Sequence, residues 1–399
     1  YDPLRPVNYP SISTRPRPYN DIPAGHDLSF FAEDYFTLPV STHTLEIQAG
    51  VRASSLLNLP KAYKLHNKFY FDPRVNMKWL FPAFFIGDQK LSYEIGGGIG
   101  WHSMMPSLTQ LYPNLLYEDI IQLNYYHNNP AYRRLQMITY IIDRTNPDLS
   151  AARNFKWEIT YAENNLSVTY FKENMTSGFR TGTRLLPLAY KTYDNNSIDA
   201  TTLDGPPDLS QMTYTQDTLM CIYGITTNGT KLRKTGVEFQ FSSKRIPALA
   251  TRITISGAYF RTVYSNSQGY YESSTKIINN RRLPYVGWYT DPDGYIRKSF
   301  NTNFMFDTHI PNLKLGFSLS AQCLWFSNQQ TEWKSGIPEY YIDSQGNSYP
   351  YTEESSQDMY LQWLKKSYNE ALFDRRISEA FNVNFNLKVT KQLYRDRIN

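Results

Sequence analysis

Apolar and polar residues alternate along several segments of this chain. Between residues 313 and 326 the odd positions are apolar and most even positions are polar, and the same alternation occurs at 155–161 and 381–389. Successive side chains of a β-strand point to opposite faces. Each segment therefore predicts a strand with one apolar and one polar face.

The pattern predicts about eleven strands. In soluble sandwiches strands are usually about 5 to 6 residues long, whereas a tilted strand that crosses a bilayer needs about 9 to 11. Several of these segments have the longer length. We expect strands at residues 26–38, 44–55, 69–80, 90–100, 154–162, 166–173, 234–243, 251–261, 299–308, 313–326 and 378–391.

The connections between these strands alternate between short and long. The short ones lie at 39–43, 82–88, 163–165, 244–250 and 310–312, and the long ones at 101–154, 175–233, 263–298 and 327–377. Outer-membrane barrels have short periplasmic turns and long extracellular loops. The sequence thus predicts an all-β fold, an antiparallel transmembrane β-barrel that is partial. Alternation alone would also suit a soluble sheet with one wet face.

Composition is compatible with a barrel. The chain has 399 residues, of which 16% are aromatic and 19% charged, and no apolar run approaches the ~18 residues of a spanning helix. The most apolar stretch, 79–86, contains Trp79, Phe81, Phe84 and Phe85. We expect these rings to form an aromatic girdle at the periplasmic interface; the alternative is a buried hydrophobic turn.

Chemistry-bearing patterns are scarce. The net charge of +5 is spread without a dense basic run, which argues against nucleic-acid binding. The six histidines are scattered, and Cys221 and Cys323 share no motif spacing, so we expect isolated thiols, no cofactor, no metal site and no enzymatic activity. The glycine-rich run 96–100 is expected in the barrel wall. Residues 291–294 and 343–347 are expected to form hairpin turns rather than calcium sites.

Six short motifs occur in one order along the chain. They are LSFFAEDY at 28–35, AGVR at 49–52, DPRV at 72–75, MPSLTQLY at 105–112, NPDL at 146–149 followed by Trp157 and Glu158, and TGVE at 235–238. In this order they resemble the barrel of TonB-dependent outer-membrane receptors, particularly those of Bacteroidetes. The resemblance covers nearly the whole chain and places it in the C-terminal part of the barrel, in the cell outer membrane among its lipids.

The resemblance also implies what this sequence lacks. Family barrels have about 22 strands and an N-terminal plug that contacts TonB. We expect residues 1–25, rich in proline, to form an irregular extracellular loop, and residues 26–399 to form a partial barrel without the plug or the closing strands. TonB would act through the absent plug, and a surface lipoprotein partner stays open.

Ligand recognition is expected in the long loops, because binding groups concentrate on loops that a rigid scaffold holds. Aromatic rings beside polar groups suit siderophores, vitamins, glycans or peptides. For any single ring, packing of loops against one another is the competing interpretation. The candidate ligand-binding residues are Trp101, Tyr112, Tyr117, Tyr125, Tyr126, Trp288, Tyr289, Trp333, Tyr340 and Tyr341.

Three functions are compatible with these patterns. The first is a receptor that binds a scarce nutrient and imports it. The second is a structural or assembly subunit of the outer membrane with a receptor-like barrel but no transport. The third is a soluble, β-rich glycan-binding protein.

Overall fold

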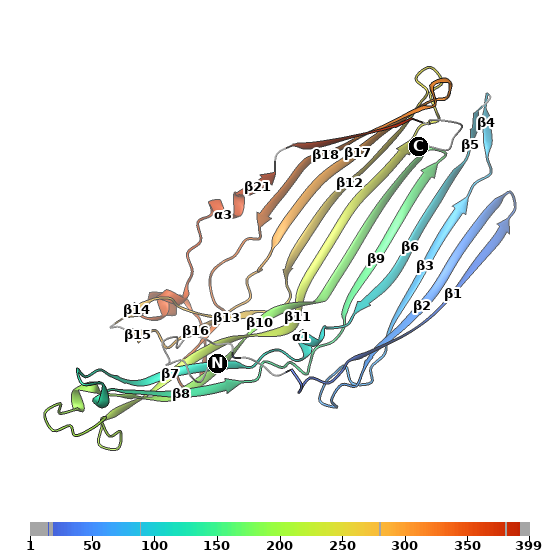
Figure 1. Cartoon of the computed structure of the whole chain (residues 1–399). Coiled ribbons are helices and arrows are strands. Elements are labelled where there is room, and N and C mark those ends of the chain that lie inside the picture. Colours follow the sequence, from blue (N-terminus) through green and yellow to red (C-terminus); the bar gives the residue numbers. More distant parts are fainter. Residues whose placement is uncertain (1–14, 16–18, 88, 279–280, 380, 392–399) are drawn as a thin grey trace.

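The computed structural model describes Arg15 and residues 19–87, 89–278, 281–379 and 381–391, and its main feature is one large antiparallel sheet (Figure 1). The strands of this sheet are β1 (His26–Val40), β2 (His43–Leu57), β3 (Tyr70–Leu80), β6 (Tyr93–Met104), β9 (Ala152–Glu163), β10 (Leu166–Tyr193), β11 (Tyr214–Ser242), β12 (Thr251–Asn266), β17 (Tyr295–Ile310), β18 (Leu315–Thr331), β21 (Arg376–Glu379) and β22 (Asn382–Lys391).

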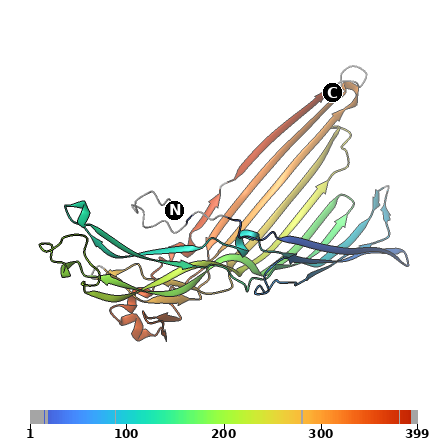
Figure 2. The same ribbon diagram turned by 60° about the horizontal axis from the view of Figure 1, so that its bottom comes forward.

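Neighbours in sequence are neighbours in the sheet. Its order is β1-β2-β3-β6-β9-β10-β11-β12-β17-β18, after which β21 and β22 both pair with β18 at different heights. The twelve strands of the described chain therefore fill eleven positions, as the alternation predicts. The edges β1 and β21–β22 do not pair with each other, and Figure 2 shows the curvature of this open wall. The predicted all-β antiparallel class of a partial barrel is confirmed.

The register sorts side chains into two faces. One cross-strand row runs through Leu166, Phe241, Ile255, Phe304, Ala321 and Phe385. The row one residue away runs through Ser167, Gln240, Ser256, Asn303, Gln322 and Asn384. Because the pleat sends adjacent residues to opposite sides, the first row belongs to an apolar face and the second to a polar face.

The apolar face is uncovered. Phe385, Leu387 and Val389 of β22 are 67%, 65% and 55% exposed. Ile99 and Ile159, in the middle of the wall, are exposed as well. Buried hydrophobic residues instead form two small clusters at the long-loop end, one around Leu65, Leu111 and Leu149 and one around Leu188 and Cys221. The described residues thus show no apolar cluster within the wall, and an exposed hydrophobic surface of this kind marks an interaction site for a protein, a membrane or a ligand.

Aromatic residues gather at the short-turn end. Trp79 donates a hydrogen bond from Nε1 to Nδ1 of His43 at 3.1 Å, and Phe81 stacks on Tyr93 with ring centroids 4.4 Å apart. At the predicted turn 82–88 the structure adds a small hairpin of β4 (Phe84–Ile86) and β5 (Gln89–Leu91), which continues past the turn. Phe85 is 68% exposed, so the alternative of a buried turn is wrong, and the girdle stays a prediction.

The long connections contain more structure than the sequence predicts. Strands β10 and β11 are 28 and 29 residues long, so the expected loop 175–233 is wrong for most of its length. The pair continues through register shifts between Met175 and Arg180, where the crowded Gly178 has no room for a side chain. A bulge of this kind keeps the strands paired while it changes their direction.

Smaller elements fill the other long connections. Residues 101–154 contain α1 (Leu108–Leu111) and a separate hairpin of β7 (Leu116–Tyr125) and β8 (Arg134–Ile142). A four-stranded loop sheet has the order β13 (Tyr270–Ser273), β16 (Val286–Tyr289), β19 (Tyr340–Ile342) and β20 (Ser348–Pro350). The remaining strands and α-helices are β14 (Ile277–Ile278), β15 (Arg281–Arg282), α2 (Glu353–Gln357) and α3 (Ala371–Asp374). None of the helices in the described residues has the length and apolar character to cross a membrane.

Three smaller expectations can be compared with the structure. The glycine-rich run 96–100 lies in β6, within the wall as predicted. Asp343 accepts backbone hydrogen bonds from Gln345 and Asn347 in the β19–β20 hairpin turn, also as predicted. The expected hairpin turn at 291–294 is wrong, because β16 and β17, which it connects, do not pair. Most of the proline-rich residues 1–25 lie outside the described part.

Candidate functional site

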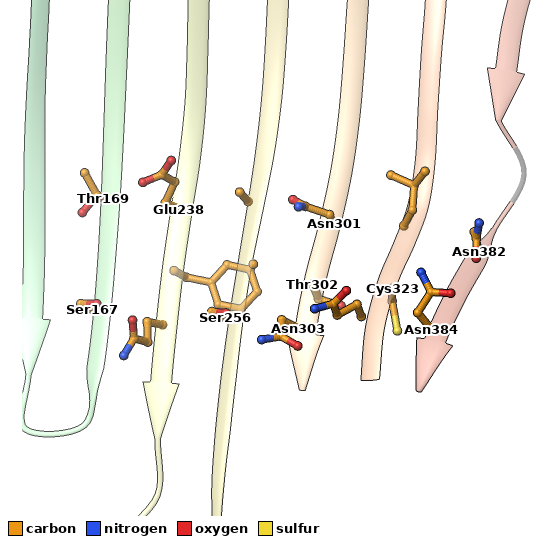
Figure 3. Close-up of a pocket in the computed structure, with 16 residues that line it drawn as sticks. Ser167, Thr169, Glu238, Ser256, Asn301, Thr302, Asn303, Cys323, Asn382 and Asn384 are labelled. Carbon is orange, nitrogen blue, oxygen red and sulfur yellow. The ribbon is translucent and has the colours of Figure 1, made fainter. Parts of the chain in front are cut away.

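The polar face of the wall forms an open groove of about 710 Å³ (Figure 3). Its floor consists of two neighbouring cross-strand rows, the Ser167–Asn384 row and a second row through Thr169, Glu238, Ala258, Asn301, Leu324 and Asn382. These side chains come from β10, β11, β12, β17, β18 and β22. Amides and hydroxyls predominate, so the groove offers neutral hydrogen-bonding groups to an aqueous lumen or to a polar partner. This is the placement expected for a lumen lining.

Charged residues occupy the next rows of the same face. Lys156 of β9 and Glu158 form an ion pair at 2.8 Å, and Glu173 of β10 is the cross-strand partner of both Lys156 and Lys234. The ammonium groups of Lys156 and Lys234 lie 5.3 and 5.2 Å from the ring centroid of Phe171. Opposite charges thus alternate across the strands on the long-loop side of the neutral groove. This arrangement stabilises the pairing of neighbouring strands.

The loop sheet holds an aromatic stack. The rings of Tyr270 and Tyr289 stack with centroids 5.5 Å apart, and Trp288 stacks on Tyr340 at 5.9 Å. Tyr289 is only 1% exposed and donates its hydroxyl to the carbonyl of Leu364 at 2.5 Å. Burial raises the pKa of Tyr289 above its usual value, so this hydroxyl keeps its proton and acts as a structural donor.

Two carboxylates, those of Asp291 and Asp293, hold residues 334–336 beside the loop sheet. Asp291 accepts hydrogen bonds from the backbone of Ser335 and Gly336, both at 2.8 Å. Asp293 accepts from Arg180 at 2.7 Å and from Lys334 at 2.8 Å. Burial works against ionisation of Asp293, but Lys334 and Arg180 outweigh it and hold its pKa below the usual value. Both carboxylates are therefore used in tying 334–336 to the wall.

A second pocket, of about 460 Å³, lies between the extended β10–β11 pair and the loop sheet. Arg180, Lys334 and Lys366 line it together with Asp293 and Glu272. Asp293 contacts the first two cations, and Lys366 forms an ion pair with Glu272. The rings of Tyr270 and Tyr368 complete the wall. Such a pocket combines aromatic surface with charged and polar groups, as small-molecule sites do.

The structure brings together only part of the predicted ligand-binding set. Trp288, Tyr289, Tyr340 and Tyr341 belong to the loop sheet. Of these, Tyr289 lines a neighbouring pocket of about 530 Å³ together with Trp363 and Lys366. Trp333 is 65% exposed outside this group.

Three other predicted rings lie around the β7–β8 hairpin. Tyr117 lies under the guanidinium of Arg15 at 4.4 Å, and Tyr125 stacks on His127 with centroids 6.4 Å apart. Tyr126 lies under Arg133 at 4.5 Å and is 69% exposed. Because no pocket described above includes them, they do not join the loop-sheet site.

The last two predicted rings serve as packing groups. Tyr112 follows α1 and packs against Tyr63, with ring centroids 5.8 Å apart. The loop placement of Trp101 is wrong: it lies in β6, next to Phe155 and under the guanidinium of Arg153 at 4.8 Å. Its position on the strand continues the apolar alternation of Ile95 and Ile99, which is the sequence signal for a wall residue.

Sequence reasoning missed the residues that line the loop pocket. These residues, Arg180, Tyr270, Lys366 and Tyr368, come from three different long connections and share no motif. Their proximity depends on the extended β10–β11 pair and on the loop sheet. The adjacent tyrosines Tyr270 and Tyr271 are of the same residue type as the predicted ligand-binding rings and lie in a long connection, which is a local sequence signal.

Within the residues that the structure describes, no cluster of three or more His, Cys, Asp or Glu side chains could hold a metal ion. Cys221 and Cys323 are buried free thiols.

The comparisons with known proteins are sparse. No family model and no curated protein matches the sequence. Among solved structures, the chain is similar to the siderophore receptor PirA from Acinetobacter baumannii, with 11% sequence identity and a TM-score of 0.39. The similarity covers 93% of this chain and 49% of that receptor, so the chain spans about half of the receptor's length.

Proposed function

We propose that this chain forms part of the wall and extracellular loops of an outer-membrane receptor of the TonB-dependent type, which binds a scarce nutrient and imports it. The observation that carries the proposal is the division of the wall into two faces. The Leu166–Phe385 row is apolar and the Ser167–Asn384 row is polar across six strands. Lipid on one side and a polar lumen on the other account for both rows.

The placement of the connections supports an outer-membrane orientation. Short turns, such as the one between Glu163 and Leu166, lie at one end of the wall, and the loop sheet and the β7–β8 hairpin lie at the other (Figure 1). Barrels of this class keep the short turns in the periplasm. The long-loop end, with its pocket, would then face the outside.

The loop pocket supports ligand binding. Asp293 contacts two of its three cations and Glu272 contacts the third, so two carboxylates face three cations and the excess positive charge is small. Tyr270 and Tyr368 add flat apolar surface. We propose a small polar ligand with a ring or chelate plane, which such a combination binds well.

A growth experiment tests the receptor proposal. A strain that lacks the gene is grown with a ferric chelate, cobalamin, a glycan or a peptide as the limiting nutrient, and is complemented with the unaltered gene or with Tyr270→Ala. We expect one nutrient to depend on the gene and its uptake to fall about tenfold in the variant. The matched control is Tyr126→Ala, which removes a 69% exposed ring from the β7–β8 tip.

A structural or assembly role in the outer membrane is the second candidate. It is favoured by the packing of Tyr112, Tyr289 and Trp288 against other side chains, which leaves fewer open rings than the sequence suggests. Normal uptake of every nutrient in the gene-deletion strain, together with altered outer-membrane integrity, would support this role and contradict the receptor proposal.

A further inference from the structure

A row of cations crosses the apolar face at the edge of its hydrophobic band that is nearest the long loops. Lys172 of β10, Thr235 of β11, Arg261 of β12 and Lys298 of β17 are successive cross-strand partners. They stand two residues beyond Tyr170, Val237, Tyr259 and Phe300, which form the last apolar row. By the period of two, the cations and the apolar residues share one face.

The cations in this row are exposed and lack ion-pair partners among the described residues. Lys172, Arg261 and Lys298 are all exposed, and none of the ion pairs between described residues includes them. Arg233 lies on the same face, one row closer to the long loops, and adds a fourth cation diagonal to Arg261. The nearby carboxylates Glu158, Glu173 and Glu238 belong to the opposite, polar face.

Arg261 and Lys298 are directly opposite each other in the antiparallel register. Like charges in this position destabilise a pair of strands, and no ion pair between described residues offsets them. An anion that binds between the two side chains would remove the repulsion.

The height of the row matches the lipid headgroups. Lys298 lies ten residues along β17 from Thr308, which is near the short-turn end, and a tilted strand needs about 9 to 11 residues to cross the hydrocarbon core. With the band from Thr308 to Phe300 in hydrocarbon, Lys172, Arg261 and Lys298 reach the level of the headgroups on the long-loop side. Cations near a membrane surface attract anionic lipids by about 1 kcal/mol each.

We infer that Lys172, Arg261, Lys298 and Arg233 form a binding site for the phosphate groups of anionic lipid headgroups in the leaflet at the long-loop end. The inference rests on the proposed membrane placement of the wall. The site would hold lipids around the barrel and would be separate from the ligand pocket in the loops.

The test uses the full chain in a neutral detergent and three probes: short-chain phosphatidylglycerol, phosphatidylcholine with the same chains, and inorganic phosphate. Binding is measured by titration calorimetry. The variant Arg261→Gln/Lys298→Gln should bind phosphatidylglycerol about 20- to 30-fold more weakly, as expected for the loss of two such cations. The charge-conserving variant Arg261→Lys/Lys298→Arg should retain binding.

A matched control removes two exposed cations from the polar face. Arg252 is the cross-strand partner of Asp307, and Lys388 that of Ser318; Arg252→Gln/Lys388→Gln should leave phosphatidylglycerol binding unchanged. Unchanged binding in the Arg261→Gln/Lys298→Gln variant would overturn the inference. So would inorganic phosphate that binds as tightly as phosphatidylglycerol and competes with it, because the site would then select an anion and not a lipid.

Insertion is measured separately, to distinguish this inference from the proposed function. Failure of the unaltered chain to enter the outer membrane would contradict both. Normal insertion without a preference for phosphatidylglycerol over phosphatidylcholine would overturn the lipid site alone.

Discussion

Phe171 of β10 and Phe260 of β12 meet above Gly236 of β11, with their ring centroids 5.8 Å apart. A Cβ atom at Gly236 would lie 2.7 Å from the ring of Phe171 and 2.8 Å from that of Phe260. The glycine therefore provides the space in which two rings from non-adjacent strands cover the strand between them. Lys234 lies over both rings, at 5.2 and 4.5 Å.

Gly236→Ala should destabilise the wall by about 1 to 3 kcal/mol, the usual range for overpacking. Urea unfolding of the detergent-folded protein measures the effect. Gly205→Ala is the control, because nothing lies within 4 Å of a Cβ atom at Gly205. Equal stability of the two variants would mean that the rings move aside at no cost.

Phe304→Arg should impair membrane insertion, whereas Asn303→Arg should be tolerated. Phe304 lies in the middle of the apolar row and Asn303 in the polar groove. An arginine on the lipid face near mid-bilayer costs about 2 to 4 kcal/mol. The measurement is the yield of heat-resistant folded protein in outer-membrane fractions. If both variants insert equally well, the apolar face does not contact lipid.

A cysteine at Asp204 should react with a membrane-impermeant maleimide on intact cells. Asp204 is exposed in the connection between β10 and β11, at the long-loop end. A cysteine at Ala248, which is exposed in the short turn between β11 and β12, should react only after the outer membrane is opened. Background labelling should be low because Cys221 and Cys323 are buried. The opposite labelling pattern would invert the topology.

Tyr289→Phe should loosen the loop sheet without affecting the wall. The substitution removes the donor to the buried carbonyl of Leu364, and an unsatisfied buried acceptor costs about 1 to 3 kcal/mol. Hydrogen exchange should become faster in β13, β16 and β19 and stay constant in β12 and β17. Tyr126→Phe, in an exposed position, is the control. Faster exchange throughout the wall would show that the two sheets unfold as one unit.

Acid should release residues 334–336 from the wall. Asp293 has a pKa below its usual value of 3.8 because Lys334 and Arg180 outweigh the effect of burial. A lowered pKa in the folded state gives a stabilisation that is present above pH 3.8 and is lost as the pH falls through the folded-state pKa. Proteolysis near Lys334 should therefore increase as the pH falls below 3.8, and Asp293→Asn should show that susceptibility already at neutral pH. An unchanged profile in the variant would exclude this ion pair as the anchor.

The sequence by itself determined the wall. Alternation in residues 313–326 and 381–389 marks two faces wherever one side meets an apolar phase and the other a polar one, because the strand period is fixed at two residues. The predicted strands at 251–261 and 299–308 accordingly lie within β12 and β17, which continue beyond them. The short turns could also be predicted from the sequence, because a connection of few residues allows few conformations.

Only the tertiary structure decided the contents of the long connections. The β10–β11 pair continues past the irregularity near Gly178 because its partner strand is available, which local alternation does not reveal. The pocket between Arg180, Tyr270 and Lys366 likewise depends on contacts between segments far apart in sequence. Trp101 and Tyr289 are both aromatic residues in expected loops, but one lies on the wall and the other is buried in the loop sheet. Residue type alone cannot distinguish these positions, because the packing around each ring decides its exposure.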